Sequence, residues 1–365
     1  MPSLTDIFED TQQRLWDDHR LRQLTYEAVN TTRVFPENFE ITRVAGMTPT
    51  RISVTGETTL QAAKRVLSQT GRSLPSGFTG RITRHVAILN FANGVNPGGG
   101  VVYGANAQEE SICRSSNLYP CLTKPECYDD FYRYNDSRGF LYSDRIIYSE
   151  NVCIFKDEAG RLLDESEWMF VDVITCPAPN LNGVGQMDDR KLSGLYNERI
   201  RNILSVAEVH GVHTLILGAF GCGAFLNPPE LMAEAFSYQL LSGDFRNTFK
   251  EVVFAIKATD PRSYYNYQVF TDYFSPFGMS QPISGRARPS AREKKASSGS
   301  GFNAVILLLT VLCLVLGVGL LILFGVGMYL SWFDGASAVV IGILPGIFIG
   351  LTVLLAWQYI QLSRS

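Results

Sequence analysis

Short apolar runs alternate with amphipathic stretches between residue 1 and about residue 282 of the 365-residue chain. Adjacent hydrophobic residues predict core strands, and hydrophobic residues spaced three or four apart predict helices. The predicted strands are 51–54, 85–91, 170–175, 214–217 and 251–256, and the predicted helices are 58–69 and one through 200–207 that ends near Gly211. Strands that alternate with helices in this way favour an α/β fold.

Two uncharged, apolar stretches occupy the C-terminal part of the sequence, from Ala304 to Tyr329 and from Gly335 to Ile360. Each is longer than the roughly 20 residues that a helix needs to cross a bilayer. Buried core helices are the alternative, but little of the chain remains to cover two of them. We therefore expect a transmembrane α-hairpin, with helices at 303–331 and 337–360 that contact the lipid bilayer.

The segment 283–302 before the first span is rich in Gly, Ser, Pro and charge, which predicts a flexible linker after a domain at 1–282. Its charges are mostly basic: Arg286, Arg288, Arg292, Lys294 and Lys295, with Glu293. Basic flanks normally stay in the cytosol, and Arg364 follows the second span. The N-terminus lacks the apolar core of a secretory signal. We expect an integral membrane protein whose domain and two termini face the cytosol.

Glycine recurs every four residues on the second predicted span, at Gly342, Gly346 and Gly350. Small residues at this spacing let two membrane helices approach closely. The close contact could join the two spans of one chain or the spans of two copies. A transmembrane homo-oligomer is therefore one possibility that the sequence raises.

Charge and cysteine content exclude several classes of site. The formal net charge is −3, and the basic residues of the 1–282 domain are not clustered as a groove for nucleic-acid phosphates requires. Six cysteines lie outside the predicted spans, in no zinc-binding pattern: Cys113, Cys121, Cys127, Cys153, Cys176 and Cys222. We expect reduced thiols in the cytosol, no metal site and no cofactor.

Two glycine-rich loops follow predicted strands, at 93–100 and 218–225. Glycine has no Cβ, so a phosphate or a ribose can approach the backbone amides of such loops closely. One loop of this kind could be an ordinary turn, but two together can clamp a diphosphate. Neither loop has the GxGxxG pattern of dinucleotide-binding proteins.

Two adjacent acids, Glu109 and Glu110, follow the first glycine loop. Hydrolysis of a glycosidic bond needs a carboxyl group that protonates the leaving oxygen. The alternative is an exposed helix start, where acids are common. Because adjacent side chains point in different directions, these two carboxyls cannot flank one bond, and their roles must differ.

The order of these motifs resembles the microbial-type poly(ADP-ribose) glycohydrolase family, a branch of the macrodomains. In this family a short spacer joins a triple glycine to Gln-Glu-Glu, and here seven residues separate 98–100 from 108–110. The resemblance extends to 59–63 and 113–119 and covers about residues 20 to 260. It implies a macrodomain-like three-layer α/β/α sandwich with an N-terminal helical extension.

The resemblance also implies roles for individual residues. Glu110 would be the catalytic acid, Glu109 and Asn96 would hold hydroxyls of the distal ribose, and Gln108 would support the loop. The residues expected around the diphosphate are Gly98, Gly99 and Gly100 in the first loop and Gly221, Cys222, Gly223, Ala224 and Phe225 in the second. Phe225 would pack against the sugar or base. The Cys222 thiol is expected to pack rather than react, because no histidine lies nearby in sequence.

The expected activity is cleavage of ribose–ribose O-glycosidic bonds in poly(ADP-ribose), with release of ADP-ribose. Three alternatives stay open: a hydrolase of single ADP-ribose groups on protein or nucleic acid, a non-catalytic ADP-ribose-binding module, and a membrane scaffold. A binding module needs the glycine loops but not the acid, and a scaffold needs neither. The intact Gln-Glu-Glu at 108–110 therefore favours a hydrolase whose partner is poly(ADP-ribose) or an ADP-ribosylated macromolecule.

Overall fold

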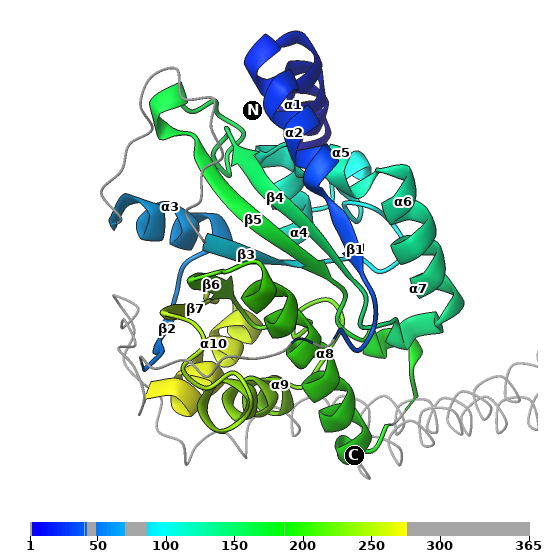
Figure 1. The fold of residues 1–365 in the computed structure, drawn as a ribbon, viewed down its shortest axis with the longest axis vertical. Helices are drawn as coiled ribbons and strands as arrows, with labels where there is room; N and C mark the ends of the chain where they lie inside the picture. The colour runs from blue at the N-terminus through cyan, green and yellow to red at the C-terminus, as the bar shows by residue number, and fades with distance from the viewer. Residues whose placement is uncertain (1, 40, 42–48, 70–85, 186, 276–365) are drawn as a thin grey trace, which may run out of the picture. The chain divides into compact units, whose positions relative to one another are not determined.

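The computed structural model describes residues 2–39, 41, 49–69, 86–185 and 187–275 (Figure 1). These residues belong to the first of two compact units, Met1–Ser284. The predicted linker at 283–302 and the predicted spans at 303–331 and 337–360 lie outside the described residues. Among the helices that are described, none is both long and apolar enough to cross a bilayer.

The described residues form a mixed sheet of seven strands in the spatial order β1-β4-β5-β3-β6-β7-β2 (Figure 1). Its strands are β1 (Arg33–Phe35), β2 (Arg51–Thr55), β3 (Val86–Phe91), β4 (Ile146–Ile154), β5 (Met169–Cys176), β6 (Thr214–Leu217) and β7 (Glu251–Ala255). The strands from β5 to β2 are parallel, whereas β4 is antiparallel to both of its neighbours. The carboxyl ends of β5, β3 and β6 therefore meet at one edge.

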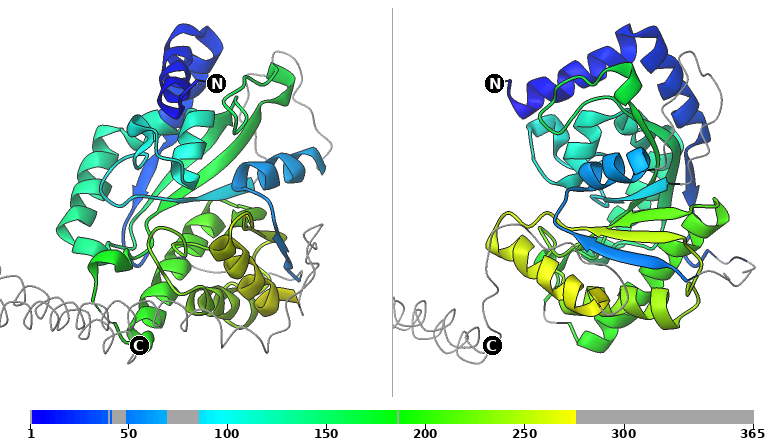
Figure 2. Two further views of the ribbon diagram at one scale, coloured as in Figure 1. Left: turned by 180° about the vertical axis from the view of Figure 1, so that it is seen from behind. Right: turned by 90° about the vertical axis from the view of Figure 1, so that its left-hand side faces the viewer.

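Helices cover both faces of this sheet (Figure 2). One face carries α8 (Asp189–Val209), α9 (Pro229–Ser237) and α10 (Pro261–Phe274). The other helices are α1 (Leu4–Asp17), α2 (His19–Thr31), α3 (Thr59–Gln69), α4 (Gln108–Ser115), α5 (Leu118–Leu122), α6 (Pro125–Cys127) and α7 (Arg133–Ser137). Alternate residues of β3 face opposite cores: Ala87 and Leu89 pack with α8 to α10, while Val86 and Ile88 pack with α2 to α5. Burial on both faces explains the continuous apolar runs in the sequence.

The prediction of an α/β sheet covered by helices is confirmed. Each of the five predicted strands has a counterpart within a residue or two, and the long helix α8 ends next to Gly211, as predicted. Gly211 has a φ of +67°, the left-handed conformation that glycine adopts most easily after a helix. Strands β1 and β4 were not predicted. In β4 the apolar run is divided by polar residues at a register shift between Ser149 and Val152.

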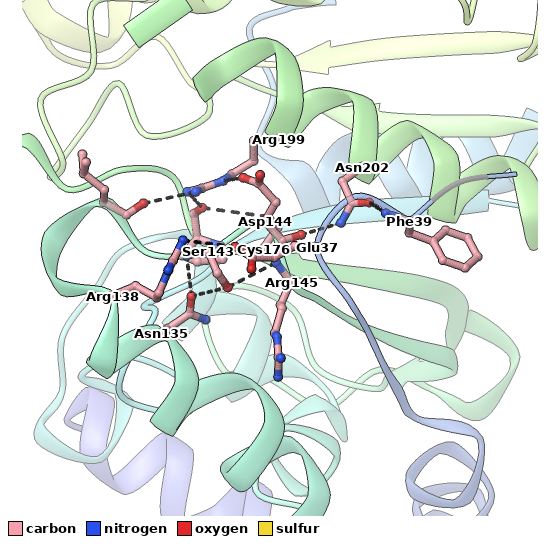
Figure 3. Close-up of polar contacts among 12 residues, drawn as sticks. Glu37, Phe39, Asn135, Arg138, Ser143, Asp144, Arg145, Cys176, Arg199 and Asn202 are labelled. Carbon is pink, nitrogen blue, oxygen red and sulfur yellow. Dashed lines mark hydrogen bonds and ion pairs between the residues drawn. The ribbon is translucent and has the colours of Figure 1, made fainter. Parts of the chain in front are cut away.

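A buried ion pair joins α8 to the segment that precedes β4 (Figure 3). Arg199 Nε donates to Asp144 Oδ1 at 2.7 Å. The other guanidinium nitrogens of Arg199 donate to the backbone oxygens of Pro177, at 2.6 Å, and Leu141, at 3.1 Å. Asn202, on the same face of α8, donates to the backbone oxygen of Asp144. These contacts fix the segment 139–145 against α8 and against the carboxyl end of β5.

Replacement of Arg199 by Met should lower the free energy of unfolding by about 3–5 kcal/mol, because the Asp144 carboxylate stays buried without its cation. The measurement is urea unfolding of the full chain. The matched control is Arg201→Met, also on α8, whose ion pair with Asp244 is largely exposed. This control should change the free energy of unfolding by less than about 1 kcal/mol. Equal decreases in the free energy of unfolding of the two variants would contradict the claim that the buried ion pair stabilises the domain more than an exposed one.

Candidate active site

Three segments meet at the carboxyl edge of the sheet. Strand β3 lies between β5 and β6, with Phe91 paired to Cys176 and Ile88 paired to Ile216. Because these strands are parallel, the segments that follow them begin side by side, which is where open α/β sheets bind ligands. The segments are 92–107 after β3, 177–183 after β5 and 218–227 after β6. Both predicted glycine loops therefore lie at this edge.

The segment after β6 is hydrogen-bonded to the segment after β5. Leu181 N donates to the backbone oxygen of Phe225 at 3.0 Å, and Asn182 Nδ2 donates to that of Ala224 at 2.6 Å. The buried Asn227 strengthens the link, because its Nδ2 donates to the backbone oxygen of Pro179 at 2.8 Å. The second glycine loop thus connects the strands on either side of β3.

The triple glycine is required by close contacts within the first loop. Gly98 and Gly99 have φ values of +69° and +61°, which non-glycine residues rarely adopt. A Cβ at Gly99 would overlap Glu110 Oε1 and lie 3.1 Å from Glu109 Oε2. A Cβ at Gly98 would lie 2.8 Å from the ring of Tyr119. The first loop can therefore lie against both carboxyl groups only because Gly99 has no side chain.

Glu110 lies in the first turn of α4 and is 7% exposed. Its Oε1 accepts the backbone N–H of Gly100 at 2.9 Å, and its Oε2 accepts that of Ala107 at 3.1 Å. These two residues bound the spacer between the triple glycine and α4. The Glu110 carboxyl thus closes the spacer into a loop and lies at the mouth of that loop.

Glu109 is more deeply buried, at 3% exposed, and its carboxyl is held by residues at and just after the end of β3. Oε2 accepts the N–H of Asn93 at 2.7 Å, and Oε1 accepts from Asn90 Nδ2 at 3.3 Å. Burial raises the pKa of Glu109 to about 8, and the negative charge of Glu110 adds to the rise. Because the two carboxyls interact, the bound proton belongs to the pair as a whole.

Gln108 fastens α4 to the carboxyl end of β3. Its Oε1 accepts the N–H of Phe91 at 2.8 Å, and its Nε2 donates to the Leu89 oxygen at 2.7 Å and to Thr59 Oγ1 at 3.0 Å. Both amide hydrogens are therefore used within the protein. Gln108 lies behind the loop and supports it.

Asn96 is exposed, and its backbone N–H donates to Asn93 Oδ1 at 2.9 Å. Asn93 Oδ1 also accepts the N–H of Val95 at 2.9 Å, so Asn93 holds a turn typical of asparagine. Neither Asn93 nor the buried Asn90 was among the predicted site residues. A signal was available in the sequence, since Asn90 is a polar residue inside a run of core-strand residues.

The second loop is less uniform than the predicted diphosphate clamp. Gly221 has a φ of +70°, and a Cβ there would overlap the Cβ of Ala178. Gly223 is exposed, and a Cβ there would meet no atom within 4 Å. Packing within the described residues therefore does not require glycine at position 223, and its expected place against the diphosphate stays a prediction. Cys222 is buried, and this burial raises the pKa of its thiol well above the usual range, so the thiol stays protonated.

Tyr142 connects the two loops and was missed in the sequence. Its ring occupies the space where a Cβ of Gly94 would lie, at 2.6 Å, and its centroid is 6.1 Å from that of Phe225. Its φ of +55° is unusual for a bulky residue, and such strain is often found at functional sites. Tyr142 lies on an irregular segment with no local motif, so only the fold reveals its position.

Backbone amides, two interacting carboxyls and two aromatic rings converge at one sheet edge. Backbone amides can bind a phosphate, and a carboxyl can protonate a leaving oxygen, so the arrangement suits a phosphorylated glycoside. Among the described residues no group of three His, Cys, Asp or Glu side chains is placed to hold a metal ion.

Comparison with known proteins gives one consistent family. The family description "Microbial-type PARG, catalytic domain" matches residues 7–157. The solved poly(ADP-ribose) glycohydrolase from Thermomonospora curvata is 34% identical, with a TM-score of 0.64, and the match covers 74% of this chain and 99% of that chain. A second structure of that enzyme contains the inhibitor ADP-HPD, at 34% identity, the same coverage and a TM-score of 0.62.

The Deinococcus radiodurans enzyme, solved in complex with ADP-ribose, is 33% identical, with a TM-score of 0.57, over 69% of this chain and 98% of that chain. No curated protein sequence matches this chain.

Replacement of Gly99 by Ala should destabilise the first loop, because the new Cβ overlaps Glu110 Oε1 and the backbone keeps a positive φ. We expect the free energy that stabilises the closed loop to fall by about 1–3 kcal/mol. The Gly100 and Ala107 amides, which donate to Glu110, should then exchange their hydrogens faster. Hydrogen exchange read by mass spectrometry measures both effects. Gly223→Ala is the control and should change neither. Unaltered exchange in Gly99→Ala would refute the close approach of the loop to the carboxyls.

Proposed function

This chain belongs to the microbial-type poly(ADP-ribose) glycohydrolase family and is a poly(ADP-ribose) glycohydrolase enzyme, and we propose that it cleaves the ribose–ribose O-glycosidic bonds of poly(ADP-ribose) to release ADP-ribose. The observation that supports the proposal most strongly is the placement of two coupled carboxyls against a glycine turn. A site that only bound ADP-ribose would have no use for an acid that protonates a leaving oxygen, which is the role proposed for Glu110.

The diphosphate of the substrate would lie against the backbone of Gly98–Gly100 and of Gly221–Phe225. Backbone amides bind such anions without a cationic side chain. Phe225 and Tyr142 would pack against the sugar or base on one side. Asn96 and Glu109 would hold hydroxyls of the distal ribose, next to the bond that is cleaved.

Glu110 would act as the general acid. As the bond between the anomeric carbon and the leaving oxygen breaks, its electron pair stays with the oxygen, which takes the proton from Glu110. A water oxygen bonds to the anomeric carbon of the departing ADP-ribose, and one water proton returns to Glu110. One water is consumed for each ADP-ribose released, and the acid is regenerated.

The burial of the two carboxyls supports this division of roles. Glu109 is the more enclosed, and burial raises its pKa to about 8, so the pair retains a proton at neutral pH. Glu110 is the less buried of the two, at 7% exposed, and would be the carboxyl that reaches the leaving oxygen. We propose that the proton held by the pair is delivered through Glu110.

Replacement of Glu110 by Gln should lower kcat by about a hundredfold or more, because the amide keeps the shape of the side chain but has no acidic proton. Release of ADP-ribose from poly(ADP-ribose) measures the loss, and calorimetry should still detect ADP-ribose binding. Glu27→Gln, at an exposed position on α2, is the control and should keep full activity. Unchanged turnover in Glu110→Gln would remove Glu110 from the role of acid.

The substrate assay also separates the remaining candidates. The native chain is incubated with poly(ADP-ribose), with mono-ADP-ribosylated protein and with ADP-ribosylated nucleic acid. Release from the polymer alone supports the proposed substrate, whereas release from a singly modified target alone would favour a mono-ADP-ribosyl hydrolase. Binding of ADP-ribose without release from any of the three would favour a non-catalytic module.

We propose further that the enzyme is anchored in a membrane by the segments 303–331 and 337–360, with its catalytic domain in the cytosol. Their length, their lack of charge and the basic residues of 283–302 support this proposal. Three quarters of this chain match 99% of the Thermomonospora curvata enzyme, so the other quarter lies outside that match.

Carbonate extraction of cell membranes should leave the full chain in the membrane fraction, because a helix that spans the bilayer is not released by high pH. A chain ended after residue 284 should be recovered as soluble protein. Protease added to the cytosolic side of sealed vesicles should release the catalytic domain. Recovery of the full chain in the soluble fraction, or protection of the domain from protease, would contradict the anchor.

A further inference from the structure

We infer that Tyr103, supported by Val102, forms a stacking subsite for an adenine of the polymer. This adenine belongs to the unit that carries the leaving oxygen, not to the ADP-ribose that is released. This inference rests on the proposed function and concerns the spacer of seven residues between the triple glycine and α4. The proposed diphosphate loop precedes the spacer and the proposed acid, Glu110, follows it. No side chain of the spacer has a role in the chemistry described above.

The spacer lies next to the proposed general acid. The backbone amides of Gly100 and Ala107 both donate to the Glu110 carboxyl, at 2.9 and 3.1 Å. The residues between them therefore form a loop around that carboxyl. Since the acid gives its proton to the leaving oxygen, the group attached to that oxygen must lie near this loop.

The loop is held rigidly by contacts from behind. Arg114, which is 4% exposed, donates to the backbone oxygen of Ala105 at 2.6 Å and to Asn106 Oδ1 at 2.7 Å. Ala105 N and Tyr103 N both donate to the Gly100 oxygen, at 3.1 and 3.0 Å. These bonds hold the loop in shape before any ligand arrives, so little order is lost when a ring packs on it.

The loop presents apolar side chains to solvent in spite of this rigidity. Val101 is fully buried and anchors the short helix η1 (Val101–Tyr103), whereas Val102 is 40% exposed and Tyr103 is 89% exposed. Tyr103 is the most exposed of the large hydrophobic residues that the structure describes. Its packing within the domain therefore does not account for the ring.

The two ends of the site are distinguishable. Tyr142 and Phe225 lie at the Gly94 end of the first loop, where the released ADP-ribose is proposed to bind. At the other end a Cβ of Gly104 would lie 3.8 Å from Leu4, so the spacer extends toward the start of α1. The carboxyl pair contacts the loop at Gly99, between these ends. We therefore assign the end with Tyr103 to the leaving group.

The chemistry of the polymer places a base there. In a ribose–ribose link the leaving oxygen is a hydroxyl of an adenosine ribose, so an adenine ring is attached to the same sugar. An exposed aromatic ring on a rigid loop suits stacking of such a base. A single ADP-ribose on an amino-acid side chain has no base on that side, so Tyr103 would favour polymer over singly modified protein.

The test compares two ligands in the full chain, with Glu110→Gln as background so that neither is consumed. ADP-ribose fills only the Phe225 side, and a dimer of two linked ADP-ribose units also reaches the Tyr103 side. Tyr103→Ala should weaken dimer binding about tenfold, within the range measured for base–aromatic stacking, and leave ADP-ribose binding unchanged. Tyr103→Phe should retain dimer affinity. Tyr26→Ala, another exposed aromatic on α2, should change neither affinity.

Steady-state kinetics give an independent readout in chains that keep Glu110. Tyr103→Ala should raise KM for poly(ADP-ribose) and leave kcat nearly unchanged, because stacking positions the polymer and does not take part in bond cleavage. Equal dimer affinity and equal KM in Tyr103→Ala and the native chain would overturn the subsite while the proposed function stands. Absence of polymer cleavage by the native chain would overturn the proposed function, and dimer binding would still decide the subsite.

Discussion

The missing side chain at Gly99 is the constraint on which the site depends. Two carboxyls in consecutive positions of a helix start normally face water. Here both face one loop residue, and a Cβ on that residue would overlap one carboxylate oxygen and press on the other. The close approach buries Glu109 and places the Gly100 amide on Glu110. Burial in turn keeps a proton on the pair at neutral pH. The need for glycine at position 99 is thus linked to the presence of a protonated carboxyl in the site.

Contacts between distant parts of the sequence hold this loop at the edge of the sheet. Because β5, β3 and β6 are parallel neighbours, their following segments start at one edge. Gln108 ties the helix start to β3, and Asn227 ties the second loop to the segment after β5. Behind them the buried pair of Arg199 and Asp144 fixes the segment that carries Tyr142 (Figure 3). Each contact joins residues far apart in sequence, so the site forms only in the folded domain.

Local patterns in the sequence were sufficient for the parts of the fold that local rules control. Strands buried on both faces appear as apolar runs, so β3, β5, β6 and β7 could be predicted, as could the glycine loops that follow two of them. Strand β4 was missed because the polar residues at its register shift, between Ser149 and Val152, divide its apolar run. Tyr142 and Asn227 were missed because their positions arise only from packing between distant segments, whereas Asn90 was missed although it is a polar residue inside an apolar strand. Gly223 shows the converse: the motif predicts a contact with the diphosphate there, and the open surroundings of Gly223 give no packing reason of their own for a glycine.

The central claim is that the carboxyl pair holds a catalytic proton at neutral pH, and the pH dependence of kcat/KM for poly(ADP-ribose) tests it most directly. A carboxyl whose pKa is raised keeps its proton below that pKa and loses it as the pH rises through it. The account therefore predicts activity that persists at neutral pH and falls on the alkaline side with an apparent pKa of about 8, the value to which burial raises Glu109. The alkaline limb should belong to the pair and shift when Glu109 is replaced by Gln. An activity that already falls through the ordinary carboxyl range of about pH 4 to 5, or one that stays constant through alkaline pH, would contradict it.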